Sequence, residues 1–104
     1  MDENKYTYSE QTEKGILQIM ALCYQINTQT DYATFCEYSG HTDQLDVRVA
    51  KGKETSRDYG ESVLRFKTIY LSGYLGENSS KTLAKVIAEL SAFLNKHKIR
   101  VGIR

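Results

Sequence analysis

The chain has 104 residues and a net charge of +1, and 40% of its residues are hydrophobic and 26% are charged. This composition is typical of a globular domain and excludes a disordered, collagen-like or membrane-embedded chain. A chain of this length buries roughly two thirds of its unfolded surface, so its core needs no disulfide or metal. We therefore expect one domain over residues 1–104, with an ordered core at about residues 9–97.

The charge is divided unevenly along the chain. Residues 1–50 hold eight acidic and three basic residues, whereas residues 51–104 hold five acidic and eleven basic residues. The C-terminal segment is the most basic part, with Lys96, Lys98, Arg100 and Arg104. Such a segment is either the cation-rich end of a helix, which the helix dipole favours, or a surface for an anionic partner.

The N-terminal residues predict a cytoplasmic protein. Met1 is followed by acidic and polar residues, not by the basic and apolar segments of a signal peptide. No apolar run approaches the ~20 residues of a membrane span, so we expect no membrane partner. Cys23 and Cys36 fall within a predicted helix and a predicted strand, which favours two small buried thiols over a disulfide.

The first predicted helix begins near Ser9 or Thr12, whose hydroxyl groups can cap a helix by accepting a bond from a free backbone N–H. It ends near Asn27, before the polar segment 28–31. Gly15 lowers its stability by about 1 kcal/mol relative to alanine. The residues expected on its buried side are Ile16, Ile19, Met20, Cys23, Ile26 and Asn27.

A β-hairpin follows this helix. Its strands are expected at about Tyr32 to Tyr38 and Leu45 to Ala50, and Gly40 is the predicted positive-φ residue of the turn between them. Apolar and polar residues alternate in the second strand, which is the pattern of a strand buried on one face. Its predicted core residues are Leu45, Val47 and Val49.

A third strand is predicted at about Val63 to Leu71, and its apolar alternation changes phase midway. This change predicts a β-bulge or a strand that is buried at one end. The last helix is expected to have Ser79 or Ser80 as its N-cap and to contain the apolar stripe from Leu83 to Leu94. Residues 99–103 form either a short extra strand or a tail.

The predicted order of elements is α, β, β, β, α. An antiparallel sheet with one apolar face needs a cover, and the amphipathic helices can provide it. The sequence therefore predicts an α+β fold in which a three-stranded antiparallel sheet has two helices packed on one face.

No motif in the sequence indicates an enzyme. The chain has no phosphate-binding loop, no nucleophile elbow, no metalloprotease helix and no pair of cysteines spaced by two residues. The potential metal ligands Cys23, Cys36, His41 and His97 have no spacing typical of zinc modules. His41 with Asp43 is a possible acid/base pair, although a structural role in the turn is favoured. We expect a non-enzymatic protein without metal or cofactor.

Two segments resemble the double-stranded-RNA-binding domain. In that family a turn histidine precedes an apolar residue by four positions, as in residues 40–49, GHTDQLDVRV. A helix there opens with a Ser-Lys-x-x-Ala-Lys pattern, as in residues 79–88, SSKTLAKVIA. The usual proline before the histidine is absent, Thr82 replaces a lysine, and the connection over residues 50–79 is long. The resemblance implies RNA or DNA binding.

A second resemblance is to small proteins encoded by phages and prophages of Gram-positive bacteria. Residues 26–49, INTQTDYATFCEYSGHTDQLDVRV, and residues 66–71, FKTIYL, are similar to that group. The resemblance implies an α+β protein of the host-cell cytoplasm. Such proteins often block host machinery by occupying its surface, as anti-CRISPR proteins do to Cas effectors. We therefore expect an inhibitor of a host protein or ribonucleoprotein, with nucleic-acid binding as the alternative.

These two functions predict different contact residues. A protein or ribonucleoprotein partner would contact the exposed side of the third strand and the loops beside it, at Tyr59, Arg65, Lys67 and Tyr74. Nucleic acid would contact His41, Lys81, Lys85, Lys96, Lys98 and Arg100. An exposed edge of the sheet would also allow two copies to pair as a homodimer.

Overall fold

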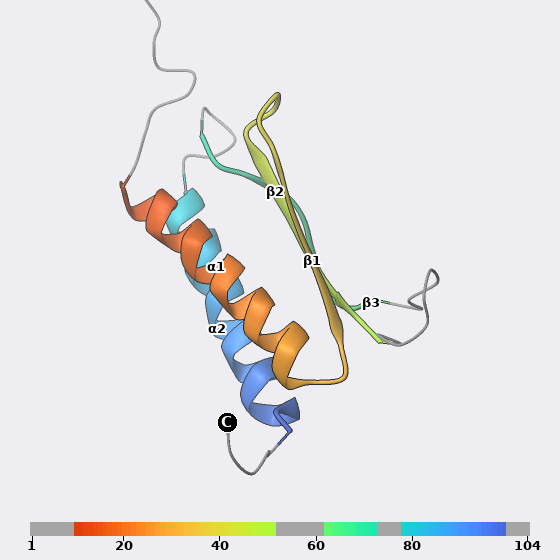
Figure 1. Cartoon of the computed structure of the whole chain (residues 1–104). Coiled ribbons are helices and arrows are strands. Elements are labelled where there is room, and N and C mark those ends of the chain that lie inside the picture. The colour runs from red at the N-terminus through yellow and green to blue at the C-terminus, as the bar shows by residue number, and fades with distance from the viewer. Residues whose placement is uncertain (1–9, 52–61, 73–77, 100–104) are drawn as a thin grey trace, which may run out of the picture.

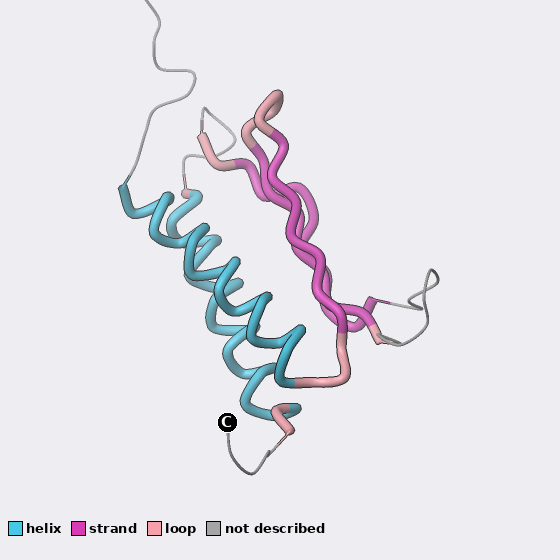
Figure 2. The backbone as a smooth tube through the Cα atoms, in the orientation of Figure 1, coloured by secondary structure: helices cyan, strands magenta, loops and turns pink. Residues whose placement is uncertain are grey.

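The structure is a computed structural model that describes residues 10–51, 62–72 and 78–99. Its elements are α1 (Glu10–Gln29), β1 (Ala33–Ser39), β2 (Gln44–Ala50), β3 (Ser62–Tyr70) and α2 (Ser79–His97). The strands form one antiparallel sheet in the order β1-β2-β3. Both helices lie on the same side of this sheet (Figures 1 and 2). The predicted α+β fold and element order are confirmed, and the C-terminal residues 100–104 lie outside the described part.

The two helices run parallel to each other. Near their starts, the hydroxyl groups of Thr12 and Ser79 are hydrogen-bonded at 3.0 Å, and this contact is buried. At the other end, the N–H of Ile99, which follows α2, donates to the carbonyl oxygen of Gln29, the last residue of α1, at 2.9 Å. These contacts at both ends set the parallel arrangement of α1 and α2.

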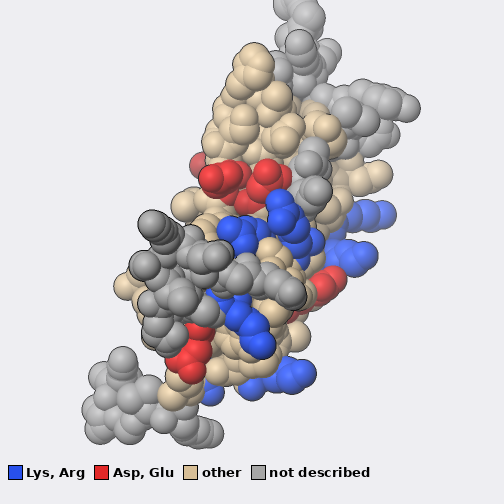
Figure 3. Space-filling model, turned by 90° about the vertical axis from the view of Figure 1, so that its right-hand side faces the viewer, with Lys and Arg blue, Asp and Glu red and all other residues tan. Residues whose placement is uncertain are grey.

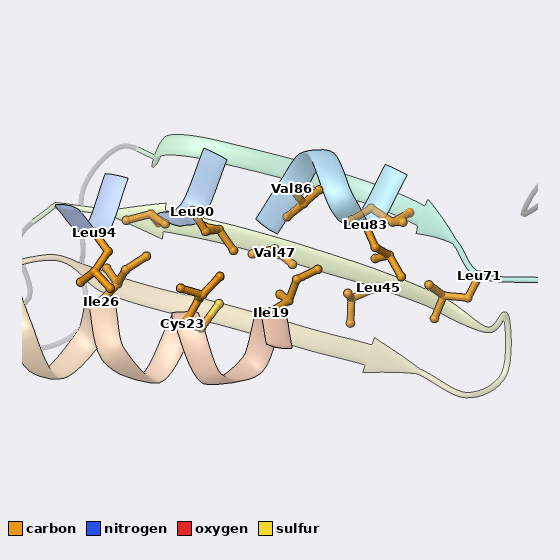
Figure 4. Close-up of a cluster of buried hydrophobic side chains, with 13 residues drawn as sticks. Ile19, Cys23, Ile26, Leu45, Val47, Leu71, Leu83, Val86, Leu90 and Leu94 are labelled. Carbon is orange, nitrogen blue, oxygen red and sulfur yellow. The ribbon is translucent and has the colours of Figure 1, made fainter. Parts of the chain in front are cut away.

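The core lies between the helix pair and the middle strand (Figure 4). Leu45, Val47 and Val49 of β2 are buried, as predicted. Strand β2 contributes most because it has a neighbour on each side, so solvent cannot reach its inner side chains from a sheet edge. The residues that cover it from the helices are Ile19, Leu22, Cys23, Ile26, Leu83, Val86, Leu90 and Leu94.

Strand β3 contains a bulge, which is one of the two explanations predicted for its change of phase. Leu45 pairs with Ile69, but Val47 pairs with Phe66, so β3 has one residue more than β2 in this interval. The extra residue shifts the alternation, since Leu64 and Phe66 pack on the core before it and Ile69 packs there after it. A second register shift follows between Val49 and Ala50.

The prediction that Met20 lies in the core is wrong. Met20 is 50% exposed, whereas Ile19 is fully buried. Consecutive residues of a helix point about 100° apart, and the buried side of α1 is centred on Ile19, so the Met20 side chain is turned toward solvent. Packing against α2 as well as the sheet directs Ile19 inward, together with Leu22 and Ile26.

Thr12 and Ser79, predicted as helix caps, and Gly15, predicted to destabilise α1, have other roles in the structure. Thr12 and Ser79 lie within their helices, where their hydroxyl groups are hydrogen-bonded to each other and join α1 to α2. The N-cap of α2 is Asn78, whose side chain makes no capping bond.

Gly15 is buried, and a Cβ at this position would lie 3.1 Å from Leu83 Cδ1 and 3.2 Å from Leu83 Cβ. Glycine therefore allows the two helices to approach closely at this crossing.

Adjacent substitutions in α1 test this orientation. We expect Ile19→Ala to lower the free energy of unfolding by about 2–5 kcal/mol because it leaves a cavity in the core. Met20→Ala should change it by no more than about 0.5 kcal/mol because its side chain is half exposed. Urea denaturation followed by circular dichroism measures both values. Equal losses for the two variants would contradict the described orientation of α1.

Candidate functional site: the outer face of the sheet

The side of the sheet that faces away from the helices carries the candidate site. Side chains alternate along β2, so Asp46 and Arg48 point away from the core residues beside them. The strand register places Phe35 and Arg65 in line with Arg48, one on each side, and it places Glu37 opposite Asp46. We call the surface formed by these five residues the outer face. None of the described helices covers it (Figure 1).

A shallow hollow of about 150 Å³ lies on this face. It is lined by Phe35, Glu37, Asp46, Val47, Arg48 and Arg65. Sites for small molecules and cofactors usually enclose about 300–1,000 Å³, so the hollow is too small and too open for that role. Its size is suited to receiving one or two side chains of a larger partner.

Arg48 is held in place at the centre of the outer face. Its guanidinium carbon lies 4.0 Å from the centre of the Phe35 ring, which is the geometry of a cation–π contact. Its Nη1 also donates a hydrogen bond to the Ser62 hydroxyl at 3.2 Å. Two fixed contacts restrict the rotamers of Arg48, so a partner that binds this guanidinium would pay a smaller entropic cost.

On the outer face, side chains of like charge lie opposite each other on neighbouring strands, so that an acidic row and a basic row each run across the sheet. Glu37 of β1 lies directly opposite Asp46 of β2, and Arg48 of β2 lies directly opposite Arg65 of β3. Like charges that face each other across strands destabilise a sheet, so stability alone does not account for this arrangement. In Figure 3 acidic and basic side chains lie beside one another on this side of the molecule. The four charges of the outer face sum to zero.

The structure locates one of the four residues predicted to contact a protein partner. Arg65 is exposed on the outer face. Tyr59, Tyr74 and the side chain of Lys67 lie outside the described part of the chain. The sequence analysis missed Phe35, Glu37, Asp46 and Arg48 as site residues. Their alternation with core residues was visible in the sequence, but the rows of like charge depend on the strand register.

The residues predicted to contact nucleic acid fall into separate groups. His41 is exposed in the β1–β2 turn, and this turn lies at the same end of the molecule as the start of α2, where Lys81 and Lys85 are exposed (Figure 1). Lys96 and Lys98 lie at the other end of α2. Fifteen helical residues span about 22 Å, so Lys81 and Lys96 belong to different surfaces. Arg100 lies outside the described residues.

The β1–β2 turn depends on Asp43. Asp43 has a φ of 52°, so it occupies the left-handed position that was predicted for Gly40. Its carboxylate accepts hydrogen bonds from the Tyr38 hydroxyl, at 2.7 Å, and from the Ser72 hydroxyl. An aspartate tolerates this conformation well and its carboxylate is bound on two sides. Asp43 is therefore placed to hold the turn.

A second surface, on α1, was also missed by the sequence analysis. Leu17 is 59% exposed and Tyr24 is 70% exposed, and Met20 lies between them along the helix. The spacing of three and four residues places their side chains on one side of α1. This apolar stripe lies on the solvent side of a helix whose other side is buried in the core.

Within the described residues, no group of three His, Cys, Asp or Glu side chains is arranged to hold a metal ion. Neither described helix is long and apolar enough to cross a membrane. No protein-family model, curated protein or solved structure matches the chain.

A double-mutant cycle tests the Arg48 contact. We expect Arg48→Met to lower the free energy of unfolding by about 1 kcal/mol, because methionine keeps the aliphatic stem but loses the cation–π contact and the bond to Ser62. In a Phe35→Leu background the same change should cost about 0.5 kcal/mol less. Chemical denaturation of the four proteins measures this coupling. Additive losses would mean that the ring and the guanidinium do not interact.

Proposed function

We propose that this protein functions by binding another protein through the outer face of its sheet. The observation that carries the proposal is the row of Glu37 and Asp46 beside the row of Arg48 and Arg65. A partner with a basic row next to an acidic row would match it, and paired charges of this kind direct binding specificity. Arginine is also enriched among the residues that contribute most of the binding energy at protein interfaces.

The charge balance favours a protein over a nucleic acid as the partner of this face. Nucleic-acid binding depends on a surplus of positive charge that neutralises phosphates. The described side chains of the outer face include two acids and two arginines, so together they offer a polyanion no net attraction. A folded protein, in contrast, can present both signs of charge within one contact area.

The mode of action that we propose is non-enzymatic inhibition. The protein would occupy a surface of a host protein or ribonucleoprotein and so block it, and an anti-CRISPR-like role against a Cas effector is one form of this action. The resemblance of residues 26–49 to small phage proteins supports this part of the proposal. The hollow on the outer face supports it too, because its dimensions suit side chains and not a substrate.

Charge reversal on the two sides of the molecule tests the proposal. The tagged chain is used to capture proteins from a lysate of a Gram-positive host, beside the variants Arg65→Glu and Lys85→Glu. Both residues are exposed, and both variants change the charge by the same amount. We expect Arg65→Glu to weaken capture of the partner at least tenfold, because it brings an acid into the arginine row. Lys85→Glu on α2 is the matched control and should capture the partner as the wild type does.

Reversal of an acidic residue of the outer face should also weaken binding of the partner. Glu37→Lys should weaken binding, and a partner variant with the opposing charge reversed should restore it. Capture that persists in Arg65→Glu, or that is lost in Lys85→Glu instead, would overturn the assignment to the outer face. Circular dichroism of each variant shows that the fold is intact.

Nucleic-acid binding is the second candidate function. It is favoured by one observation, which is that His41, Lys81 and Lys85 are exposed at the same end of the molecule. Titration with duplex RNA at low salt should then show binding that weakens steeply as salt is added. The double variant Lys81→Glu, Lys85→Glu should abolish it, whereas Arg65→Glu should leave it unchanged. Absence of binding at low salt would exclude this function.

A further inference from the structure

Cys23 and Cys36 meet at the junction of α1 and β1. Cys23 is almost completely buried in α1, and Cys36 is partly buried in β1, in the position that pairs with Val47 of the core. The Thr34 hydroxyl donates to the carbonyl oxygen of Cys23 at 2.8 Å and so holds the helix against the strand beside this pair. Both cysteines are free thiols, and Cys36 packs against the core cluster that contains Cys23. The two thiols lie close enough that each shifts the pKa of the other.

The two thiols differ in reactivity. The hydrogen bond from Cys23 lowers the pKa of Cys36, and this effect outweighs the opposing effect of burial. The same bond and burial both raise the pKa of Cys23, which therefore keeps its proton. The thiolate is the reactive form of cysteine, so Cys36 is the nucleophile of the pair.

Solvent access to the two thiols also indicates that Cys36 is the nucleophile. Strand β1 is at the edge of the sheet, and the Cys36 side chain is partly exposed there. Cys23 is enclosed by the core, so a reagent in solution reaches Cys36 first. A partly exposed thiol beside a buried thiol is arranged for reaction in two steps.

We infer that Cys36 and Cys23 form a reactive thiol pair that reduces a low-molecular-weight disulfide and becomes an intramolecular disulfide between β1 and α1. In the first step the Cys36 thiolate attacks one sulfur of the small disulfide. The S–S bond of the reagent breaks, one small thiolate leaves and takes a proton, and a mixed disulfide forms on Cys36.

In the second step Cys23 acts as the resolving thiol. It loses its proton and attacks the sulfur of Cys36, which releases the second small thiol. The protein has then lost two protons and two electrons, and the small disulfide has been reduced to two thiols. The bond would close a loop of the chain that runs from α1 into β1, so it would restrict the unfolded state and stabilise the fold.

Reaction of the full chain with oxidised glutathione tests the inference. We expect intact-mass spectrometry to show wild-type protein that has lost two hydrogen atoms and carries no glutathione, with both free thiols gone. Proteolysis followed by mass analysis should identify one peptide pair that joins Cys23 to Cys36 within a monomer. Reduction with dithiothreitol should restore the original mass.

Single variants separate the two roles. Cys23→Ser should stop after the first step and accumulate one glutathione on Cys36, because the resolving thiol is missing. Cys36→Ser should react at least tenfold more slowly than the wild type when folded, and at an ordinary rate in denaturant, because Cys23 is buried. Cys23→Ala and Cys36→Ala replace the serine variants if circular dichroism shows that a serine variant is unfolded.

Three results would overturn the inference. One is a folded wild type that retains glutathione on Cys36 without forming the internal bond. Another is a Cys36→Ser variant that reacts as fast as the wild type in the folded state. The third is a wild type whose thiols react only after denaturation, which would make both cysteines inert core residues.

Discussion

The burial of one face of β2 is the constraint on which the rest of this structure depends. Leu45, Val47 and Val49 lie beneath the pair of parallel helices, and they have a strand on each side. Apolar burial contributes about 25 cal/mol for each Å² removed from water, so a shift of β2 by one residue would expose its entire inner face and be strongly unfavourable. The register of the sheet is therefore fixed from its centre.

The fixed register has a consequence on the opposite side of the sheet. Once the inner residues of β2 are placed, Asp46 and Arg48 must face outward, and the neighbouring strands must place Glu37 and Arg65 beside them. The core therefore supports the charge rows of the outer face, although it makes no contact with a partner. Opposed like charges cost some stability, which the hydrophobic side of the same strands offsets.

Helix packing decides the other surfaces. Gly15 brings α1 close to Leu83 of α2, and the Thr12–Ser79 bond joins their first turns. The resulting rotation of α1 turns Ile19 and Cys23 inward and leaves Met20 in solvent. The same rotation brings Cys23 against Cys36, so the thiol pair and the exposed apolar stripe of α1 have one common cause.

The sequence by itself determined the order of the elements, the inward side of β2, the apolar stripe of α2 and the change of phase in β3. Each of these follows from the spacing of apolar residues within one segment, and burial acts on that spacing directly. Only the tertiary structure decided the roles of Met20, Thr12 and Ser79, the left-handed position of Asp43, and the meeting of Cys23 with Cys36. The opposition of Glu37 to Asp46 and of Arg48 to Arg65 belongs to this second group. These features join residues of different segments, and the spacing within a single segment does not specify how helices cross or how strands align.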